Sequence, residues 1–175
     1  STMENNMRKS PIAGQTVFIT GASSGIGKAC AEQFAALGVN LVITARRLKR
    51  LEKISKELSA KYGIKVIPIQ LDVQKNQQVE AVFKRLNSQK VKIDILINNA
   101  GLALSTDLMQ DGDVNNWDVM IDTNIKGLLY VTKAFLPSMI KRNRGHILNI
   151  GSVAGHGCYI PGNIYCATKH AVKAI

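Results

Sequence analysis

The sequence predicts an α/β domain with a doubly wound parallel sheet. Along the chain, short runs of apolar and β-branched residues alternate with segments whose apolar residues recur at helical spacing. Strands that are separated by helices pair in parallel, because each crossover returns the chain to the same edge of the sheet. The 175 residues, 46% of them hydrophobic, can bury one core, and we therefore expect a single domain.

The first strand, helix and second strand follow one another closely. Thr16–Thr20 (TVFIT) is a wholly apolar or β-branched run, which is typical of a strand buried on both faces. Helical spacing of apolar residues predicts a helix over Ile26–Leu37, with Gly38 as its C-cap. Val39–Thr44 is then the second strand of the predicted sheet.

The third strand contains Pro68, which indicates its place in the sheet. Because proline cannot donate a hydrogen bond to a neighbouring strand, this strand is expected at a sheet edge, where the strand order 3-2-1-4-5 puts it. The third strand covers Lys65–Leu71, and the two strands after it cover Ile93–Ile97 and His146–Ile150. The remaining predicted helices cover Leu48–Tyr62, Val79–Leu86 and Trp117–Ile140, and a last helix begins near Gly162 or Asn163.

The two ends of the chain carry separate expectations. Residues 1–13 are expected to form a flexible N-terminal segment, in which Ser1 and Thr2 look like a cloning remnant ahead of Met3. Residues 14–175 are expected to form the one domain. Because the sequence stops at Ile175 while the last predicted helix is still running, we expect a fold that is incomplete at its C-terminal end.

Composition excludes several classes of protein. The apolar runs are far shorter than the roughly 20 residues that cross a bilayer, so a membrane-spanning protein is excluded. The N-terminus lacks the apolar stretch of a secretory signal, and the cysteines at 30, 158 and 166 lack metal-ligand spacing. We therefore expect a cytoplasmic protein without a metal site.

The net charge of +11 is concentrated in two clusters. Cations are favoured at the C-terminus of a helix, which explains the second cluster, and the first cluster is explained below by a bound anion. We therefore do not expect nucleic acid as a partner. The first cluster comprises Arg46, Arg47, Lys49, Arg50, Lys53 and Lys56, and the second comprises Lys141, Arg142 and Arg144.

A glycine-rich turn between the first strand and the first helix predicts a nucleotide site. There a phosphate can meet free backbone N–H groups and the positive end of the helix dipole, as in a Rossmann-type fold. A Walker A loop is excluded, because five residues separate Gly21 from Gly27 and Ala29 stands where that loop needs Ser or Thr. A glycine turn without a ligand stays open as the alternative. The expected phosphate-binding residues are Gly21, Ser23, Ser24, Gly25, Ile26 and Gly27.

The end of the second strand indicates which dinucleotide is bound. An acidic residue there would hold a ribose 2′-hydroxyl, whereas an arginine accommodates a 2′-phosphate. Arg46 and Arg47 occupy this position, so NADP is favoured over NAD, with plain solvated charges as the alternative. Asp72, after the third strand, can either reach the adenine or cap a helix, and both interpretations stay open.

Taken in order along the chain, these motifs resemble the short-chain dehydrogenase/reductase family. The resemblance covers Thr16 to Ile175, and it is nearest to the branch that oxidises serine and related 3-hydroxy acids with NADP. The motifs that carry it are Thr20-Gly-x-x-x-Gly25-x-Gly27, Asn98-Asn99-Ala100-Gly101, Ser152, Tyr165-x-x-x-Lys169 and Asn124, the last at the remaining position of the family's catalytic tetrad.

The chemistry of hydride transfer gives these residues roles. The oxygen of a carbonyl under reduction needs a proton donor, and a phenol such as Tyr165 serves only if its anion is stabilised. Lys169, four residues on, lies on the same helix face, so its charge can stabilise that anion while its ammonium donates to the nicotinamide ribose. Ser152, at the end of a strand, can hold the substrate oxygen.

Further roles and partners come from the resemblance alone. It implies that Asn124 holds a water that links Lys169 to solvent, and that Asn98, Ala100 and Gly101 line the cofactor cleft. It also implies a homodimer or homotetramer that pairs through the long helix and the helix after it. The substrate is expected to be a small hydroxy or keto compound.

Two alternative functions were weighed. A hydrolase built on Ser152 and His156 would need an orienting acid and a Gly-x-Ser-x-Gly turn, which Gly151-Ser152-Val153-Ala154 does not form. The histidines are therefore interpreted as structural or substrate-lining. A dinucleotide-binding protein without turnover, in which Tyr165 and Ser152 are ordinary structural residues, stays open.

Overall fold

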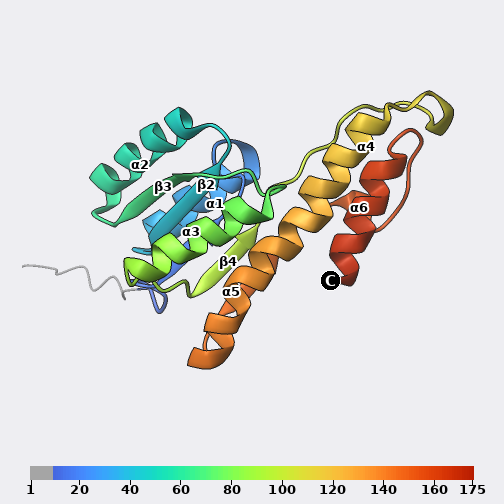
Figure 1. Ribbon diagram of the computed structural model, residues 1–175. Coiled ribbons are helices and arrows are strands. Elements are labelled where there is room, and N and C mark those ends of the chain that lie inside the picture. The colour runs from blue at the N-terminus through green and yellow to red at the C-terminus, as the bar shows by residue number, and fades with distance from the viewer. Residues whose placement is uncertain (1–9) are drawn as a thin grey trace, which may run out of the picture.

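A computed structural model describes residues 10–175, and these residues form a five-stranded parallel sheet in the order β3-β2-β1-β4-β5 (Figure 1). The predicted fold class and strand order are confirmed. The prediction of a flexible segment over residues 1–13 lies largely outside the described residues. The strands are β1 (Thr16–Ile19), β2 (Asn40–Ala45), β3 (Val66–Gln70), β4 (Ile95–Asn98) and β5 (His146–Asn149).

Strand β3 lies at one edge of the sheet, as its proline predicts. Pro68 is paired with Ile43 of β2, and the other side of β3 has no strand beside it among the described residues. The missing N–H of Pro68 can therefore face away from the ladder at no cost. Strand β1 is central and pairs with β2 and β4, which agrees with its fully buried Val17, Phe18 and Ile19.

Helices cover both faces of the sheet. Side chains of a strand alternate between faces, so Val17 and Ile19 belong to the core beneath α1 and α2, whereas Phe18 belongs to the core beneath α3 and α5. The α-helices are α1 (Gly25–Ala36), α2 (Leu48–Tyr62), α3 (Asn76–Ser88), α4 (Val114–Ile121), α5 (Leu128–Arg142) and α6 (Asn163–Ala174), and the short turns are η1 (Met109–Asp111), η2 (Asp122–Gly127) and η3 (Val153–Gly155).

The long helix differs from its prediction in where it begins and in its regularity. It was expected as a single α-helix over Trp117–Ile140, but it begins at Val114 and contains the π-helical turn η2 between α4 and α5. Figure 1 shows α4, η2 and α5 as one rod with α6 beside its upper part. A π turn inserts one residue into a helix and often marks a functional position, and Asn124 lies in it.

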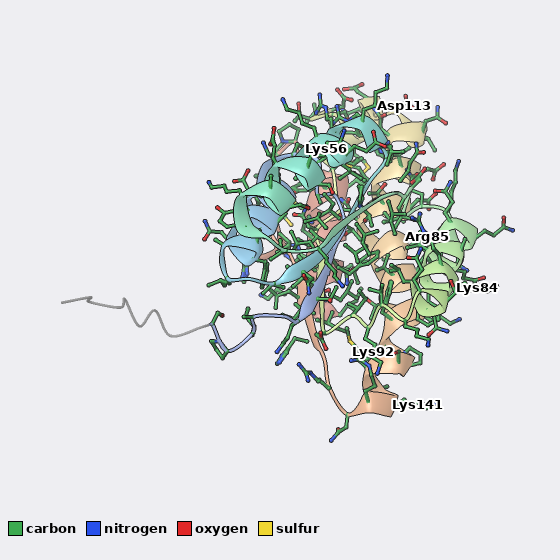
Figure 2. The ribbon with its side chains drawn as sticks, turned by 90° about the vertical axis from the view of Figure 1, so that its left-hand side faces the viewer. Lys56, Lys84, Arg85, Lys92, Asp113 and Lys141 are labelled. Carbon is green, nitrogen blue, oxygen red and sulfur yellow. The ribbon has the colours of Figure 1, made fainter. Side chains whose placement is uncertain are left out.

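At the amino edge of the sheet, where the strands begin, Asp94 joins three segments through one hydrogen bond and two ion pairs. Its carboxylate accepts from the backbone N–H of Thr16 at 3.0 Å and lies 3.4 Å from a guanidinium nitrogen of each of Arg142 and Arg144. Figure 2 shows Lys92 and Lys141 at this end of the molecule, far from Asp113 at the other. The second basic cluster therefore lies away from the carboxyl edge, where the cleft described below opens. None of the helices in residues 10–175 is long and apolar enough to cross a membrane.

Candidate active site

A cleft of about 420 Å³ opens at the carboxyl edge of the sheet, where parallel α/β folds bind ligands. It is bounded by the loops after β1, β2, β3, β4 and β5 and by α6, so segments far apart in sequence meet there. The predicted site residues that line it are Gly21, Ser23, Ser24, Gly25, Ile26, Arg46, Arg47, Asp72, Ala100, Gly101, Tyr165 and Lys169.

The glycine turn lets α1 approach the loops closely. A Cβ atom on Gly27 would collide with the carbonyl oxygen of Gly21 and with the Asn99 side chain. Gly21 has a φ of +63°, which a residue with a side chain rarely adopts. The first turn of α1 holds no acidic residue, so its free N–H groups and dipole face the cleft without a competing negative charge.

Thr20 and Asn99 join the glycine turn to the loop after β4. The Thr20 hydroxyl oxygen accepts from the backbone N–H groups of Asn99 at 3.0 Å and Ala100 at 2.9 Å. In return the Asn99 amide donates to the carbonyl oxygens of Thr20 and Gly21. These contacts fix the two loops that face the cleft, and the sequence alone indicates no role for either side chain.

Arg46 and Arg47 are exposed at the end of β2 beside the cleft. Among residues 10–175 neither has a carboxylate within ion-pair distance, so both guanidinium groups can meet an anion there. Asp72 also lines the cleft, and its Oδ1 accepts from the N–H of Gln74 at 3.1 Å. Because the N-cap of α3 is Lys75, Asp72 closes the turn before that helix and does not cap the helix itself.

Tyr165 and Lys169 lie one turn apart on α6, and both line the cleft as their spacing predicts. The Lys169 Nζ atom is 5.9 Å from the centre of the Tyr165 ring and donates to the carbonyl oxygen of Ile150 at 3.4 Å. Lys169 is buried, and no carboxylate of residues 10–175 lies within ion-pair distance of it. Burial lowers the pKa of the Lys169 amine from its ordinary value.

Asn124 is held beside this pair by side-chain hydrogen bonds. Its Oδ1 accepts from the Leu102 N–H at 2.9 Å, and its Nδ2 donates to the Leu102 carbonyl at 3.0 Å and to the Thr168 hydroxyl at 3.0 Å. A Cβ on Gly101 would lie 3.2 Å from both Asn124 Oδ1 and Lys169 Nζ, so only a glycine leaves these two groups undisturbed. Sequence reasoning assigned no role to Leu102 or Thr168.

Four predicted site residues do not line the cleft, namely Asn124, whose contacts are given above, and the three residues Asn98, Gly27 and Ser152. Asn98 is buried beneath it, where its Nδ2 donates to Thr132 and Asn149 at 3.0 Å each, so the neighbouring Asn99 faces the cleft instead. Gly27 supports the phosphate turn from below. Ser152 adjoins the cleft-lining Gly151, and its hydroxyl oxygen accepts from the N–H of Ala154 at 3.2 Å.

The histidines do not form the dyad of a hydrolase. The ring of His156 lies 3.3 Å from Lys173 Nζ, and the ring of His170 lies 2.8 Å from the Cys166 carbonyl oxygen. No hydrogen bond joins His156 to Ser152 in the part of the chain that the structure describes. Nor do residues 10–175 contain a group of three His, Cys, Asp or Glu side chains that could hold a metal ion.

Comparisons with known proteins agree with this geometry. A family described as short chain dehydrogenase matches residues 15–175. An NADP-dependent 3-hydroxy acid dehydrogenase of Schizosaccharomyces pombe is 44% identical over 164 residues, which are 93% of this chain and 63% of that protein. A sulfoacetaldehyde reductase of Chromohalobacter salexigens is 44% identical over 158 residues, covering 90% of this chain and 62% of that protein.

A solved structure is similar as well. The closed form of a serine dehydrogenase complexed with NADP⁺ superposes with a TM-score of 0.84 at 42% identity, covering 91% of this chain and 63% of the other. The chain thus spans less than two thirds of the length of these relatives.

Proposed function

The chain belongs to the short-chain dehydrogenase/reductase family, and from this premise we propose that the protein transfers a hydride between NADP(H) and a small hydroxy or keto substrate. The observation that carries the proposal is the pair of Tyr165 and Lys169 in a cleft that also contains a glycine turn and two arginines without an ion-pair partner among residues 10–175. A phenol, an amine and an anion-binding turn in one cleft are the groups that carbonyl reduction with a dinucleotide requires.

The residues fit NADP at both ends of the cleft. The glycine turn leaves no room for a Cβ on Gly27, which keeps the N–H groups of α1 within reach of a pyrophosphate. Arg46 and Arg47 can meet a 2′-phosphate, and no carboxylate of residues 10–175 pairs with either of them. Bound NADPH supplies the hydride for reduction, and bound NADP⁺ accepts it in the opposite direction.

The chain's own residues then handle the proton and the substrate oxygen. In reduction, Tyr165 donates its phenolic proton to the oxygen of the former carbonyl, and the Lys169 ammonium stabilises the resulting phenolate. The Ser152 hydroxyl oxygen already accepts from Ala154, so its own O–H proton is free to donate to the substrate oxygen. Asn124 holds the Leu102 backbone beside Lys169 and thereby shapes this end of the cleft.

The substrate class follows from the relatives. The Schizosaccharomyces pombe protein is named for 3-hydroxy acids, and the matching structure is of a serine dehydrogenase. We extend this class to the present protein, with serine as a candidate. The sulfoacetaldehyde reductase widens the set to small carbonyl compounds with an acidic group.

The proposal also includes a homodimer or homotetramer in the cytoplasm. Pairing of α5 and the next helix along the chain, α6, with a second copy is supported by Leu129, Leu136 and Ile140, which are exposed along α5. A reducing compartment is supported by the cysteines at 30, 158 and 166, which are all free thiols.

The test is the activity of a Tyr165→Phe variant of the full-length protein with NADP⁺ on a panel of 3-hydroxy acids. The variant lacks the proton donor, so kcat should fall about 10²- to 10⁴-fold while the NADPH affinity, measured by fluorescence titration, stays within about twofold. Wild-type protein should bind NADPH at least about tenfold more tightly than NADH, because only NADPH offers a 2′-phosphate to Arg46 and Arg47.

The matched control is Tyr130→Phe, a half-buried tyrosine of α5 outside the cleft, which should keep wild-type kcat. Full activity in Tyr165→Phe would remove the proposed acid–base role. Tight NADPH binding by a wild type that turns over no carbonyl or alcohol would favour a dinucleotide-binding protein without turnover.

A further inference from the structure

We infer that Thr168 is a positioning residue for the proposed reaction: its buried hydroxyl sets the placement of α6, which carries Tyr165 and Lys169, against Asn124 and the loop after β4. This inference rests on the proposed function. Thr168 itself does not line the cleft, so it acts on the reaction through its neighbours.

The hydroxyl of Thr168 makes two directed hydrogen bonds in a site closed to water. Thr168 is only 1% exposed, and its Oγ1 accepts from Asn124 Nδ2 at 3.0 Å and donates to the Tyr165 carbonyl oxygen at 2.8 Å. Because an amide nitrogen can only donate, the hydroxyl proton has to go to the Tyr165 carbonyl. Because the Thr168 hydroxyl donates to Tyr165, it can only accept from Asn124, so the Asn124 side chain has to present its Nδ2 atom to Thr168.

Asn124 continues this chain of bonds to the wall of the cleft. Its amide bonds both the N–H and the carbonyl of Leu102, which lines the cleft, while its Nδ2 reaches Thr168. Three segments, namely the loop after β4, the π turn η2 and α6, are therefore joined through two side chains. Gly101 fits between Asn124 Oδ1 and Lys169 Nζ, so a shift of Asn124 would change the space around the Lys169 amine.

The hydroxyl of Thr168 is needed for its hydrogen bonds and not only for its packing. Valine has nearly the shape of threonine, but it cannot accept from Asn124 or donate to the Tyr165 carbonyl. A buried amide N–H without an acceptor costs about 1–3 kcal/mol, so the Asn124 side chain would rotate to recover a partner. That rotation would give up one or both bonds to Leu102 and change the relative positions of the loop wall and Lys169.

The bond to Tyr165 acts on the helix itself. A threonine hydroxyl that bonds a carbonyl three residues earlier bends the turn that lies between them. Here that turn contains Tyr165 and ends next to Lys169. The same hydroxyl therefore influences both the contact between α6 and η2 and the local geometry of the proposed catalytic pair.

The test compares Thr168→Val and Thr168→Ser in the full-length protein. In the valine variant kcat should fall about ten- to hundredfold while the NADPH dissociation constant and the substrate KM stay within about threefold, because the glycine turn, the two arginines and Ser152 lie on other segments and remain in place. The serine variant keeps the hydroxyl and should recover kcat to within about threefold of wild type. A merely structural role would lower stability in both variants and leave kcat per folded molecule unchanged.

A second measurement does not depend on turnover. The Leu102 amide proton is bound to Asn124, so its hydrogen exchange, measured by NMR, should accelerate at least about tenfold in Thr168→Val and return toward wild type in Thr168→Ser. Thr132→Val is the matched control, because Thr132 accepts from another buried asparagine, Asn98, and neither residue lines the cleft or contacts Asn124 or Leu102 by a hydrogen bond. It should change neither kcat nor Leu102 exchange.

The outcomes separate this inference from the proposed function. Wild-type kcat or wild-type Leu102 exchange in Thr168→Val, or a serine variant as impaired as the valine variant, would overturn the positioning role even when Tyr165→Phe is inactive. An inactive wild type would overturn the proposed function, and Leu102 exchange would then decide the positioning role by itself.

Discussion

At the scale of single residues, the amine of Lys169 is buried in the cleft, and no carboxylate in the described part of the chain lies within ion-pair distance of it. Burial lowers the pKa of this amine below its ordinary value of 10.5. Between the lowered value and 10.5 the unfolded chain binds more protons than the folded chain, so the free energy of unfolding rises with pH in this window. Below the lowered value the cost of burying the charge is present in full.

We therefore expect a Lys169→Met variant to be more stable than wild type at neutral pH, with a difference that shrinks as the pH approaches 10.5. Urea unfolding at pH 7 and at pH 10 measures this difference. Lys84→Met is the control, since Lys84 is an exposed residue of α3 and its replacement removes no buried charge (Figure 2). A pH-independent difference for Lys169→Met would show that the folded amine titrates as it does in the unfolded chain.

The residues of the cleft differ in how far their places could be predicted. Tyr165 and Lys169 were predictable because their spacing on one helix places them together whatever the rest of the fold does. The places of Asn98 and Asn99 were not, because successive residues at the end of β4 point in opposite directions and only the packing of Thr132 and Asn149 decides which asparagine is buried. Thr168 finds its partner 44 residues away, and local sequence cannot show such a contact.

At the scale of elements, strands were predictable and the π turn was not. Strands β1, β2, β3 and β4 are short, mainly apolar runs, and Pro68 indicated the place of β3 at the edge of the sheet. The π turn η2 has no comparable pattern in the sequence. It brings the buried Gly127 against Val73, where a Cβ atom would lie 2.6 Å from a Val73 methyl carbon. The turn thus depends on contact with a loop about 50 residues earlier in the sequence.

The contact of α1 with the phosphate turn gives a prediction at this scale. In Gly27→Ala the new methyl group would meet the carbonyl oxygen of Gly21 and the Asn99 amide, so α1 has to move away from both loops. We expect a net loss of about 1–2 kcal/mol of stability, because the overpacking outweighs the better helix propensity of alanine. NADPH affinity should fall at least about tenfold, as measured by fluorescence titration alongside urea unfolding.

Gly157→Ala is the matched control for this change. A Cβ atom at Gly157 has open space around it, so both stability and NADPH affinity should stay close to wild type. If Gly27→Ala bound NADPH as tightly as wild type while losing stability, the close approach of α1 would serve the fold alone and not the cofactor.

At the scale of the whole molecule, the two edges of the sheet carry positive charge for different reasons. At the carboxyl edge, Arg46 and Arg47 line the cleft, where an anion can bind, and they form no ion pair with any residue that the structure describes. At the amino edge, Arg142 and Arg144 neutralise Asp94, which also holds the start of β1. The net charge of +11 therefore does not require a nucleic-acid partner, and the first cluster fits the proposed dinucleotide.

The outer face of α5 is where we expect two copies to meet. Leu129, Leu136 and Ile140 are 43%, 37% and 68% exposed, and their spacing of seven and four residues places them in one stripe along the helix. Placing a charge in the centre of this stripe with Leu136→Glu would leave that charge without a partner in the interface. The dissociation constant of the dimer should therefore rise at least about thirtyfold.

Light scattering coupled to size-exclusion chromatography, over a range of protein concentrations, measures this change for the full-length protein. Leu37→Glu is the matched control, because Leu37 is 46% exposed at the end of α1, away from α5, and its replacement should leave the mass unchanged. A wild-type protein that stays monomeric at every concentration would refute pairing altogether. A Leu136→Glu variant that keeps the wild-type mass would place the interface on another surface, because an unpaired glutamate cannot be buried in the stripe without weakening the pairing.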